Sequence, residues 1–252
     1  MQFRVLLGDI TKWKADGIVN SASTTLLDVS PLDHRLYKAA GIAFAGACWN
    51  QRGCQVGKAK LVRAYKLPAT YVIQAVGPYW LGGKRDEEKD LISAYTQSLA
   101  VAQEKGLRHL AFTSLSTEDK RYPRQRAAAI AVPLLLQKGQ SFDRIDIVCE
   151  DEDIQKAYVN AAVFYWLQLL QDANRADQKR VILAGAAALA VLTLTATTPD
   201  PLVVADGVQR MQKLLRDFVK NSNYTSIVAV EQTAAKIMAV YNIQGKGAGV
   251  NE

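Results

Sequence analysis

The sequence has few of the side chains that cross-link small proteins or hold metal ions. Its 252 residues include three cysteines, Cys48, Cys54 and Cys149, and two histidines, His34 and His109. An odd number of cysteines without a CxxC pair argues against a disulfide framework and against a zinc site. We therefore expect reduced thiols in a cytosol, and neither a metal nor a cofactor.

The pattern of a secretory signal peptide is also missing. The first residues, MQFRVLLGDITKW, have a short apolar run and then charges, without a long apolar core or a small-residue cleavage site. A cytoplasmic location is therefore expected. The alternative is membrane association through residues 181–198, which carry no charge and approach the minimum length of a membrane span. Their richness in alanine and threonine fits a buried helix of a small bundle equally well.

The composition is that of an ordinary soluble protein, with 49% hydrophobic and 22% charged residues. A chain of this length can bury a proper core without cross-links. The net charge of +7 is compatible with anionic ligands or nucleic acid and identifies neither. Because Glu and Asp are interspersed along the chain, no basic arm of the nucleic-acid-binding type is expected.

Short apolar runs alternate with longer helical stretches through the first two-thirds of the chain. Strands separated by helices predict a three-layer α/β/α domain with a mixed, mostly parallel sheet covered on both faces. Ligands of such sheets bind at the carboxyl ends of strands, which here means after GIVN (17–20) and after AFTSL (111–115). We predict strands at 3–7, 17–20, 59–63, 70–76, 109–115 and 143–149, and helices at 34–50, 87–105, 124–138 (kinked or broken at Pro133) and 152–172.

The pattern changes after about residue 172. Residues 178–197, 202–220 and 223–242 are predicted to be three helices, followed by a flexible tail. We therefore predict a domain at 1–170 and an all-helical C-terminal extension at 171–252. The apolar stripe of the second helix favours packing within its own domain, and a surface for a partner protein or a membrane is the alternative.

Four stretches together resemble the macrodomain family, in its ADP-ribose-binding, Appr-1''-p processing type. They are Gly8-Asp9-Ile10 with DGIVNSAS (16–23), KAAG (38–41), VGKAKLVRAYKLPATYVIQAVGP (56–78) and FTSLST…YP (112–123). They correspond to the family's GDI…DAIVNAAN, RAAG, GEA…LPAKYVIHTVGP and FPAISTGVYGYP. Each piece alone is weak, but four in the family's order and spacing over roughly residues 1–165 are specific.

The resemblance implies a ligand and a set of ligand-binding residues. The ligand is ADP-ribose or a related adenine nucleotide. Asp9 would bind the adenine amino group, with the Ile10 backbone beside it, although Asp also suits a turn before a helix. Asp33 falls on the acidic residue that activates water or orients the distal ribose in the family's hydrolases, so it is the one candidate catalytic residue. The remaining candidate ligand-binding positions are Asn20, Ser23, Tyr37, Ser116, Thr117, Glu118 and Tyr122.

The first ligand loop departs from the family pattern. The family has GGGVDGAIH between LL and RAAG, whereas this chain has DVSPLDHRLY at residues 28–37 with no glycine. Glycine permits left-handed dihedral angles and a close approach of the backbone to phosphate, and Pro31 also removes a donor. Ser23 replaces the second Asn of the family's NAAN, the usual partner of the acid. Tyr37 replaces a family histidine and could stack on a ribose.

The second ligand loop departs in the same way. The family's STGVYGYP becomes STEDKRYP at residues 116–123, so that Glu118 and Arg121 replace both glycines. Carboxylates beside a diphosphate cost on the order of 1–4 kcal/mol at surface-like dielectric. Lys120, Arg121 and Arg124 could offset that cost, but a solvated charged loop is the favoured interpretation. Gln74 and Ala75, which replace the family's His-Thr, are interpreted as packing changes.

Three functions remain open from the sequence. The first is a divergent binding module that holds ADP-ribose or a related nucleotide without turnover. The second is a hydrolase acting on ADP-ribosyl groups or on O-acetyl-ADP-ribose. The third is a degenerate macrodomain that acts as a scaffold or sensor, with a protein partner bound through its C-terminal helices. No feature indicates nucleic acid clearly, and membrane contact at 181–198 is possible but not favoured.

Overall fold

The computed structural model describes residues 1–172. The helices predicted at 178–197, 202–220 and 223–242, and the uncharged segment 181–198, lie outside the described residues. Within residues 1–172, no helix combines the length and the apolar composition that crossing a membrane requires.

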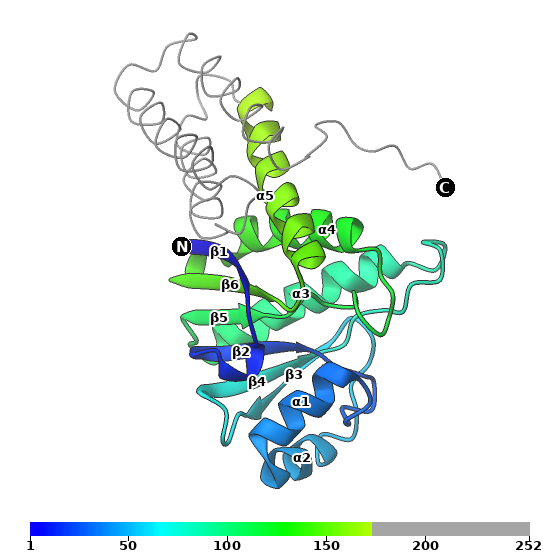
Figure 1. Ribbon diagram of the computed structural model, residues 1–252, viewed down its shortest axis with the longest axis vertical. Helices are drawn as coiled ribbons and strands as arrows, with labels where there is room; N and C mark the ends of the chain where they lie inside the picture. Colours follow the sequence, from blue (N-terminus) through cyan, green and yellow to red (C-terminus); the bar gives the residue numbers. More distant parts are fainter. Residues whose placement is uncertain (173–252) are drawn as a thin grey trace. The chain divides into compact units, whose positions relative to one another are not determined.

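A six-stranded sheet in the order β1-β6-β5-β2-β4-β3 forms the centre of the fold (Figure 1). The first five of these strands run parallel, and the edge strand β3 pairs with β4 in the antiparallel direction. The mixed, mostly parallel sheet expected from the sequence is therefore present. The strands are β1 (Gln2–Leu7), β2 (Ala15–Ser21), β3 (Ala59–Arg63), β4 (Ala69–Ala75), β5 (His109–Phe112) and β6 (Arg144–Cys149).

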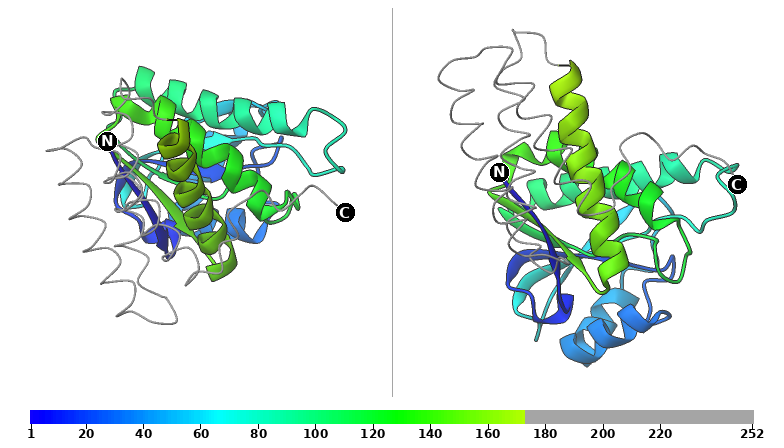
Figure 2. Two further views of the ribbon diagram at one scale, coloured as in Figure 1. Left: turned by 90° about the horizontal axis from the view of Figure 1, so that it is seen from above. Right: turned by 45° about the horizontal axis from the view of Figure 1, so that its top comes forward.

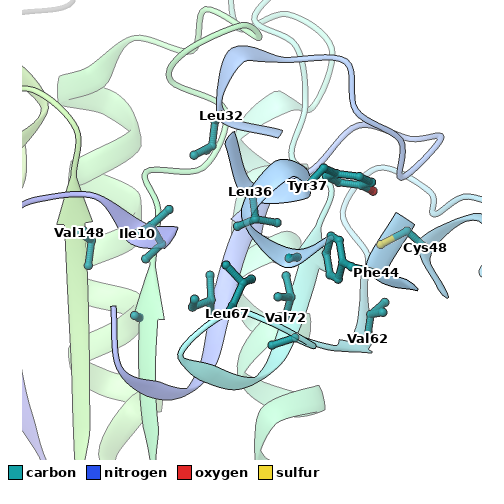
Figure 3. Close-up of a cluster of buried hydrophobic side chains, with 14 residues drawn as sticks. Ile10, Leu32, Leu36, Tyr37, Phe44, Cys48, Val62, Leu67, Val72 and Val148 are labelled. Atoms are coloured by element: carbon teal, nitrogen blue, oxygen red, sulfur yellow. The ribbon is translucent and has the colours of Figure 1, made fainter. Parts of the chain in front are cut away.

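Helices lie on both faces of the sheet (Figures 1 and 2). On one face, α1 and α2 pack over β2, β3 and β4, and Figure 3 shows Leu36 and Phe44 meeting Val62 and Val72 there. On the other face, Tyr95 of α3 stacks on Phe112 of β5 with ring centroids 5.8 Å apart. The helices are α1 (Pro31–Ala40), α2 (Ile42–Trp49), α3 (Glu87–Glu104), α4 (Arg124–Lys138) and α5 (Glu152–Asp172), with short 3-10 turns at Ile10–Lys12 and Gly139–Ser141.

The helix predicted at 34–50 is two helices. The first begins earlier than predicted, because the Ser30 hydroxyl caps it and Pro31 occupies its first turn, where a missing N–H costs nothing. Gly41 then separates α1 from α2 with a φ of 88°, a left-handed conformation that glycine adopts without strain. Pro133 lies inside α4, which continues through it to Lys138.

Candidate functional site

Four parallel strands deliver polar side chains to one edge of the sheet. Asp9 follows β1, Asn20 and Ser21 end β2, the loop 113–123 follows β5, and Glu150 follows β6. Parallel strands end at the same edge, so these residues lie where open α/β sheets bind ligands. We call the segment 116–123 the β5–α4 loop.

A buried pair of polar side chains, Asn20 and Asp33, occupies the carboxyl end of β2. Asn20 donates from Nδ2 to Oδ1 of Asp33 and to Oε1 of Gln74, both across 2.8 Å. Asn20 and Gln74 are register neighbours on β2 and β4, which explains their contact. Gln74 also donates to Cys48 Sγ at 3.4 Å and to Tyr37 Oη at 3.5 Å. The interpretation of Gln74 as a packing change was therefore incomplete, because its amide holds the partner of Asp33.

Two acceptor atoms of this pair have no partner. Oδ1 of Asn20 and Oδ2 of Asp33 are buried and accept no hydrogen bond from the protein. Burial raises the pKa of Asp33 and the charge of Asp119 adds to the rise, against hydrogen bonds from Asn20 and Ser30 and the charge of Lys120. A buried acceptor without a donor is costly, so this place suits a group that brings hydroxyl donors.

Lys120 is the unexpected member of the site. Its side chain is almost fully buried, at 2% exposure, and its ammonium group donates to the carbonyl oxygen of Ala22 across 2.5 Å. Burial lowers the pKa of Lys120, whereas the charges of Asp119 and Asp33 act in the opposite direction. Lys120 therefore joins the β5–α4 loop to the residue that follows β2, and it places a positive charge within electrostatic reach of Asp33.

The rest of the β5–α4 loop is also largely buried. Ser116, Thr117 and Tyr122 are at most 6% exposed, and the Tyr122 ring packs against Trp80 with centroids 4.8 Å apart. The Ser116 amide donates to Ser21 Oγ at 3.0 Å, and Thr117 Oγ1 bonds to Ser114 Oγ at 2.8 Å. The expectation of a solvated charged loop was wrong for Lys120, which is buried, whereas Arg121 is exposed as expected. The buried Ser116 hydroxyl has no hydrogen-bond partner among the described residues.

The backbone of this loop keeps a glycine-like conformation without glycine. Arg121, which replaces a family glycine, has a φ of 55°, and Ser116 has a φ of 66°. Non-glycine residues pay roughly 1–2 kcal/mol in this region. Arg121 therefore adopts a left-handed conformation at an energetic cost, whereas Glu118, at the other replaced glycine, does not have a positive φ. Arg124 is engaged elsewhere, in ion pairs with Asp151 at 3.2 Å and Asp153 at 3.1 Å.

Glu118, in the β5–α4 loop, and Glu150, after β6, form an acidic pair. Burial, together with the charge of Glu150, raises the pKa of Glu118 to about 7, although Arg35 opposes the rise; Asp119 and a hydrogen bond with Glu150 support it. Arg35, on α1, forms an ion pair with Glu150. Near neutral pH Glu118 is therefore only partly ionised.

Asp9 is the N-cap residue of the 3-10 helix Ile10–Lys12. Its Oδ1 accepts hydrogen bonds from the Thr11 amide at 3.0 Å and the Thr11 hydroxyl at 2.7 Å, and its side chain remains 39% exposed. Burial acts to raise its pKa, but the Thr11 hydrogen bonds and the charges of Lys12 and Arg35 lower it overall. Asp9 is thus a partly exposed carboxylate whose second oxygen, Oδ2, lies 3.7 Å from Lys12 Nζ, whereas the Ile10 side chain is buried in the core (Figure 3).

Two predicted site residues lie in other surroundings. Ser23 bonds to Thr25 Oγ1 at 2.9 Å and to the Leu27 carbonyl oxygen at 3.4 Å, and the donor to Asp33 is Asn20 instead. The Tyr37 ring is packed in the core against Phe44, with its hydroxyl on the Leu26 carbonyl oxygen (Figure 3). A ring held in the core in this way does not present a face to a ribose, so the stacking expected of Tyr37 was wrong.

The sequence placed Gln74 among packing changes and considered Lys120 only as a cation beside a diphosphate, so neither was predicted as a buried member of the site. The only signal for Lys120 was its position at an aromatic residue of the family's STGVYGYP, and for Gln74 its position at a histidine. Within residues 1–172, no group of three or more His, Cys, Asp or Glu side chains could hold a metal ion. What the site offers is carboxylate and amide oxygen atoms, with two cationic groups close by.

Comparison with known proteins identifies the family. A model of the Macro domain matches residues 19–131. A macro domain-containing protein of Methanosarcina mazei is 38% identical over 163 residues, which cover 64% of this chain and 87% of that protein. The chain belongs to the macrodomain family. An O-acetyl-ADP-ribose deacetylase of Klebsiella pneumoniae is 39% identical over 165 residues, which cover 63% of this macrodomain chain and 94% of the relative.

Solved macrodomain structures share the fold. A mutant macrodomain from Oceanobacillus iheyensis with ADPR has a TM-score of 0.61 and 29% identity, covering 65% of this chain and 92% of its own. A Trypanosoma brucei macrodomain in complex with ADP-ribose has a TM-score of 0.57 and 32% identity, and the match covers 62% of this chain and 67% of that one. These likenesses account for about two-thirds of the present macrodomain chain.

Proposed function

We propose that this macrodomain binds ADP-ribose, or a related adenine nucleotide, without turning it over. The observation that carries the proposal is the pair of buried, unpartnered acceptors on Asn20 and Asp33 at the ligand edge of the sheet. The hydroxyl groups of a ribose are donors of the kind that these atoms lack. The two solved relatives described above hold this ligand.

Asp9 supports the adenine end of the proposal. One of its oxygens is held by Thr11, and the side chain remains partly exposed and anionic. A carboxylate oxygen with a free lone pair accepts the hydrogen bond of an exocyclic amino group. Asp9 and Asp33 follow different strands of one parallel sheet, as two ends of an extended ligand require.

The amides of α1 support binding without turnover. Pro31 has no N–H, the Asp33 amide donates to Ser30 Oγ at 3.0 Å, and the His34 amide donates to the Ser30 carbonyl oxygen at 2.8 Å. These donors are satisfied within the protein, so fewer remain to hold a diphosphate at this helix terminus. Hydrolysis needs tight positioning of the reacting atoms, and losses of positioning reduce rates steeply.

Calorimetric titration of the full chain with ADP-ribose tests the proposal. We expect saturable binding that Asp9→Ala and Asp33→Ala weaken by about tenfold or more, the value of one lost charge-assisted hydrogen bond. Asp143→Ala is the matched control, because this exposed carboxylate precedes β6 at the opposite edge of the sheet. Absence of heat at about millimolar ligand would refute nucleotide binding and leave the scaffold function.

Hydrolysis is the second candidate, and the raised pKa of Asp33 favours it. A carboxylate of raised pKa is a stronger base toward water. The Klebsiella pneumoniae relative is named an O-acetyl-ADP-ribose deacetylase. Release of acetate from O-acetyl-ADP-ribose by the full chain, abolished in Asp33→Ala and retained in Asp143→Ala, would establish this function in place of binding alone.

A further inference from the structure

The outer face of α2 consists of apolar and small side chains. The helix, Ile42–Trp49, has the sequence IAFAGACW, in which no side chain is charged and the only polar groups are the Cys48 thiol and the Trp49 indole N–H. Phe44 and Cys48 point into the core (Figure 3), and Ala45 and Ala47 are partly buried against it, so the opposite side of the helix faces outward. We call Ile42, Ala43, Gly46 and Trp49 the α2 face; all four are exposed.

The exposure of this face is unusually high for large apolar residues. The Ile42 side chain is 92% exposed and Trp49 is 69% exposed, and they lie seven residues apart on the same side of the helix. Single exposed apolar residues need no explanation, but two that project together from a helix without charged side chains indicate an interaction surface. Figures 1 and 2 show α2 on the outside of the domain, next to α1.

Basic residues flank both ends of the α2 face. Lys38 lies near the end of α1, four residues before Ile42 and across the break at Gly41. The Lys66 side chain approaches Gly41, where its Nζ lies 3.8 Å from the position of an added Cβ. At the other end, the Arg52 amide bonds to the Trp49 carbonyl oxygen at 3.0 Å, and Lys60 Nζ bonds to the Gln51 carbonyl oxygen at 2.6 Å. None of these four cations forms an ion pair with the described carboxylates of residues 1–172.

The chain segment that contains the α2 face has no carboxylate of its own, although Asp28 and Glu150 from outside it pair with His34 and Arg35 at its start. Residues 34–85 contain no Asp and no Glu, although they contain nine Lys and Arg residues. The interspersed charge of the whole chain therefore conceals one basic segment, which includes α2 and the edge strand β3. A positive rim around an apolar centre complements a surface that is both anionic and apolar.

We propose that the α2 face docks the protein on an anionic lipid bilayer. Trp49 and Ile42 would enter the boundary between headgroups and acyl chains, where tryptophan is favoured, and Lys38, Lys66, Arg52 and Lys60 would contact the anionic headgroups. A second copy is disfavoured as the occupant, because two such faces would bring their positive rims together. A nucleic acid would pair its phosphates with the basic residues around the α2 face but would leave the exposed Ile42 without an apolar contact.

Vesicle sedimentation with the full chain tests this docking. We expect binding to mixed phosphatidylserine–phosphatidylcholine vesicles and little binding to phosphatidylcholine alone. Lys38→Gln and Lys66→Gln should each weaken it about fivefold, the value of one basic residue at an anionic surface. Ile42→Ser with Trp49→Ser should weaken it about tenfold or more. Added salt should release the protein, because the headgroup attraction is screened.

Matched variants on α3 and α4 act as controls. Ile92→Ser replaces the same residue type on an exposed surface, and Lys89→Gln with Lys138→Gln removes the same charge. These variants should bind vesicles as the parent does, and circular dichroism should show all variants folded, because every altered side chain is exposed. Binding through residues 181–198 would be insensitive to the α2 substitutions, so vesicle binding that these leave unchanged overturns the proposal.

Three other outcomes also overturn it. One is no binding to anionic vesicles at low salt. Another is binding of a single-stranded oligonucleotide that the α2 substitutions abolish, without vesicle binding. The last is a dimer in analytical ultracentrifugation that Ile42→Ser dissociates, again without vesicle binding.

Discussion

Asn20 donates a hydrogen bond to Asp33 across 2.8 Å in a place where neither side chain is more than 1% exposed. The bond joins the end of β2 to the first turn of α1. It also fixes the orientation of the Asp33 carboxyl group, because the same Asn20 amide is held by Gln74. The Asp33 carboxyl group is therefore held in place by hydrogen bonds within the protein, although the loop before α1 has no glycine.

Removal of this donor should destabilise the fold. In Asn20→Ala the Asp33 carboxyl and the Gln74 amide oxygen lose their buried donor, and we expect the free energy of unfolding in urea to fall by about 1–3 kcal/mol. Asn50→Ala, at an exposed position after α2, should change it by no more than about 0.5 kcal/mol. Equal stability of Asn20→Ala and the parent would show that the bond contributes nothing net.

The affinity for ADP-ribose should fall as the pH rises from 6 to 8, because the pKa of Glu118 is about 7. The neutral acid predominates below that pH, and the carboxylate that forms above it repels the diphosphate. The same raised pKa means that the folded state holds a proton that the unfolded state, with a glutamate pKa of about 4.3, has already lost. Stability should therefore also decline across this window.

Calorimetry and thermal unfolding at three pH values measure both effects. Glu118→Gln removes the titrating group and should flatten both profiles. Glu88→Gln, an exposed acid on α3, should leave them unchanged. A pH dependence that survives Glu118→Gln would assign the effect to another group.

Restoration of the family's glycine at position 121 should be nearly neutral. Arg121→Gly relieves a left-handed conformation worth roughly 1 kcal/mol, while it adds a similar amount of freedom to the unfolded chain. Ala129→Gly, at an exposed site inside α4, lacks the first effect and should cost about 1 kcal/mol. Urea unfolding of both variants makes the comparison, and equal losses would contradict the strained turn at Arg121.

Asp146 should control the stability of the fold at low pH. Burial acts to raise its pKa, but hydrogen bonds from His109, Arg4 and Trp13 and the charge of Arg4 hold it well below the ordinary value. The contacts are 2.8 Å from His109, 2.5 and 2.6 Å from Arg4, and 2.9 Å from Trp13. A depressed folded-state pKa gives stability that is present above about pH 4 and is lost as the pH falls further.

Asp146→Asn should therefore cost about 3 kcal/mol at pH 7, the penalty of breaking a buried ion pair. The difference in the free energy of unfolding between Asp146→Asn and the parent should become smaller as the pH is lowered. Asp143→Asn, whose pair with Arg108 is exposed, should change the profile little. A constant difference between Asp146→Asn and the parent at all pH values would contradict the titration of Asp146.

Local patterns predicted most of the described fold. The runs FRVLL, GIVN and DRIDIVC and the periodicity of residues 87–105 depend on neighbours in sequence, so β1, β2, β6 and α3 could be anticipated. The break at Gly41 could not, because alanine-rich segments on both sides favour a helix and one backbone angle of 88° decides the outcome. The residues 113–115, expected to extend β5, instead start the loop that bears Ser116.

The candidate site was less predictable because its contacts are long-range. The bond from Lys120 to Ala22 spans 98 residues, and the ion pair of Arg35 with Glu150 spans 115. Charged residues in a loop are expected to be exposed to solvent when only the sequence is known. The ammonium group of Lys120 is buried because another segment supplies a carbonyl oxygen, that of Ala22, as its acceptor. Asp9 and Asp33 could be predicted because a family motif marks their positions. The hydrogen bond between Gln74 and Asn20 could not be predicted, because no motif marks it.

Gly41 lets one short stretch of chain present residues to two different surfaces. The helix before it bears Asp33 and Arg35, and the helix after it bears Ile42 and Trp49, while the φ of 88° changes the chain direction between them. The two helices still share one core, because the Tyr37 ring packs against Phe44 with centroids 4.9 Å apart. A substitution that shifts α1 would therefore be transmitted to the α2 face through this pair of rings.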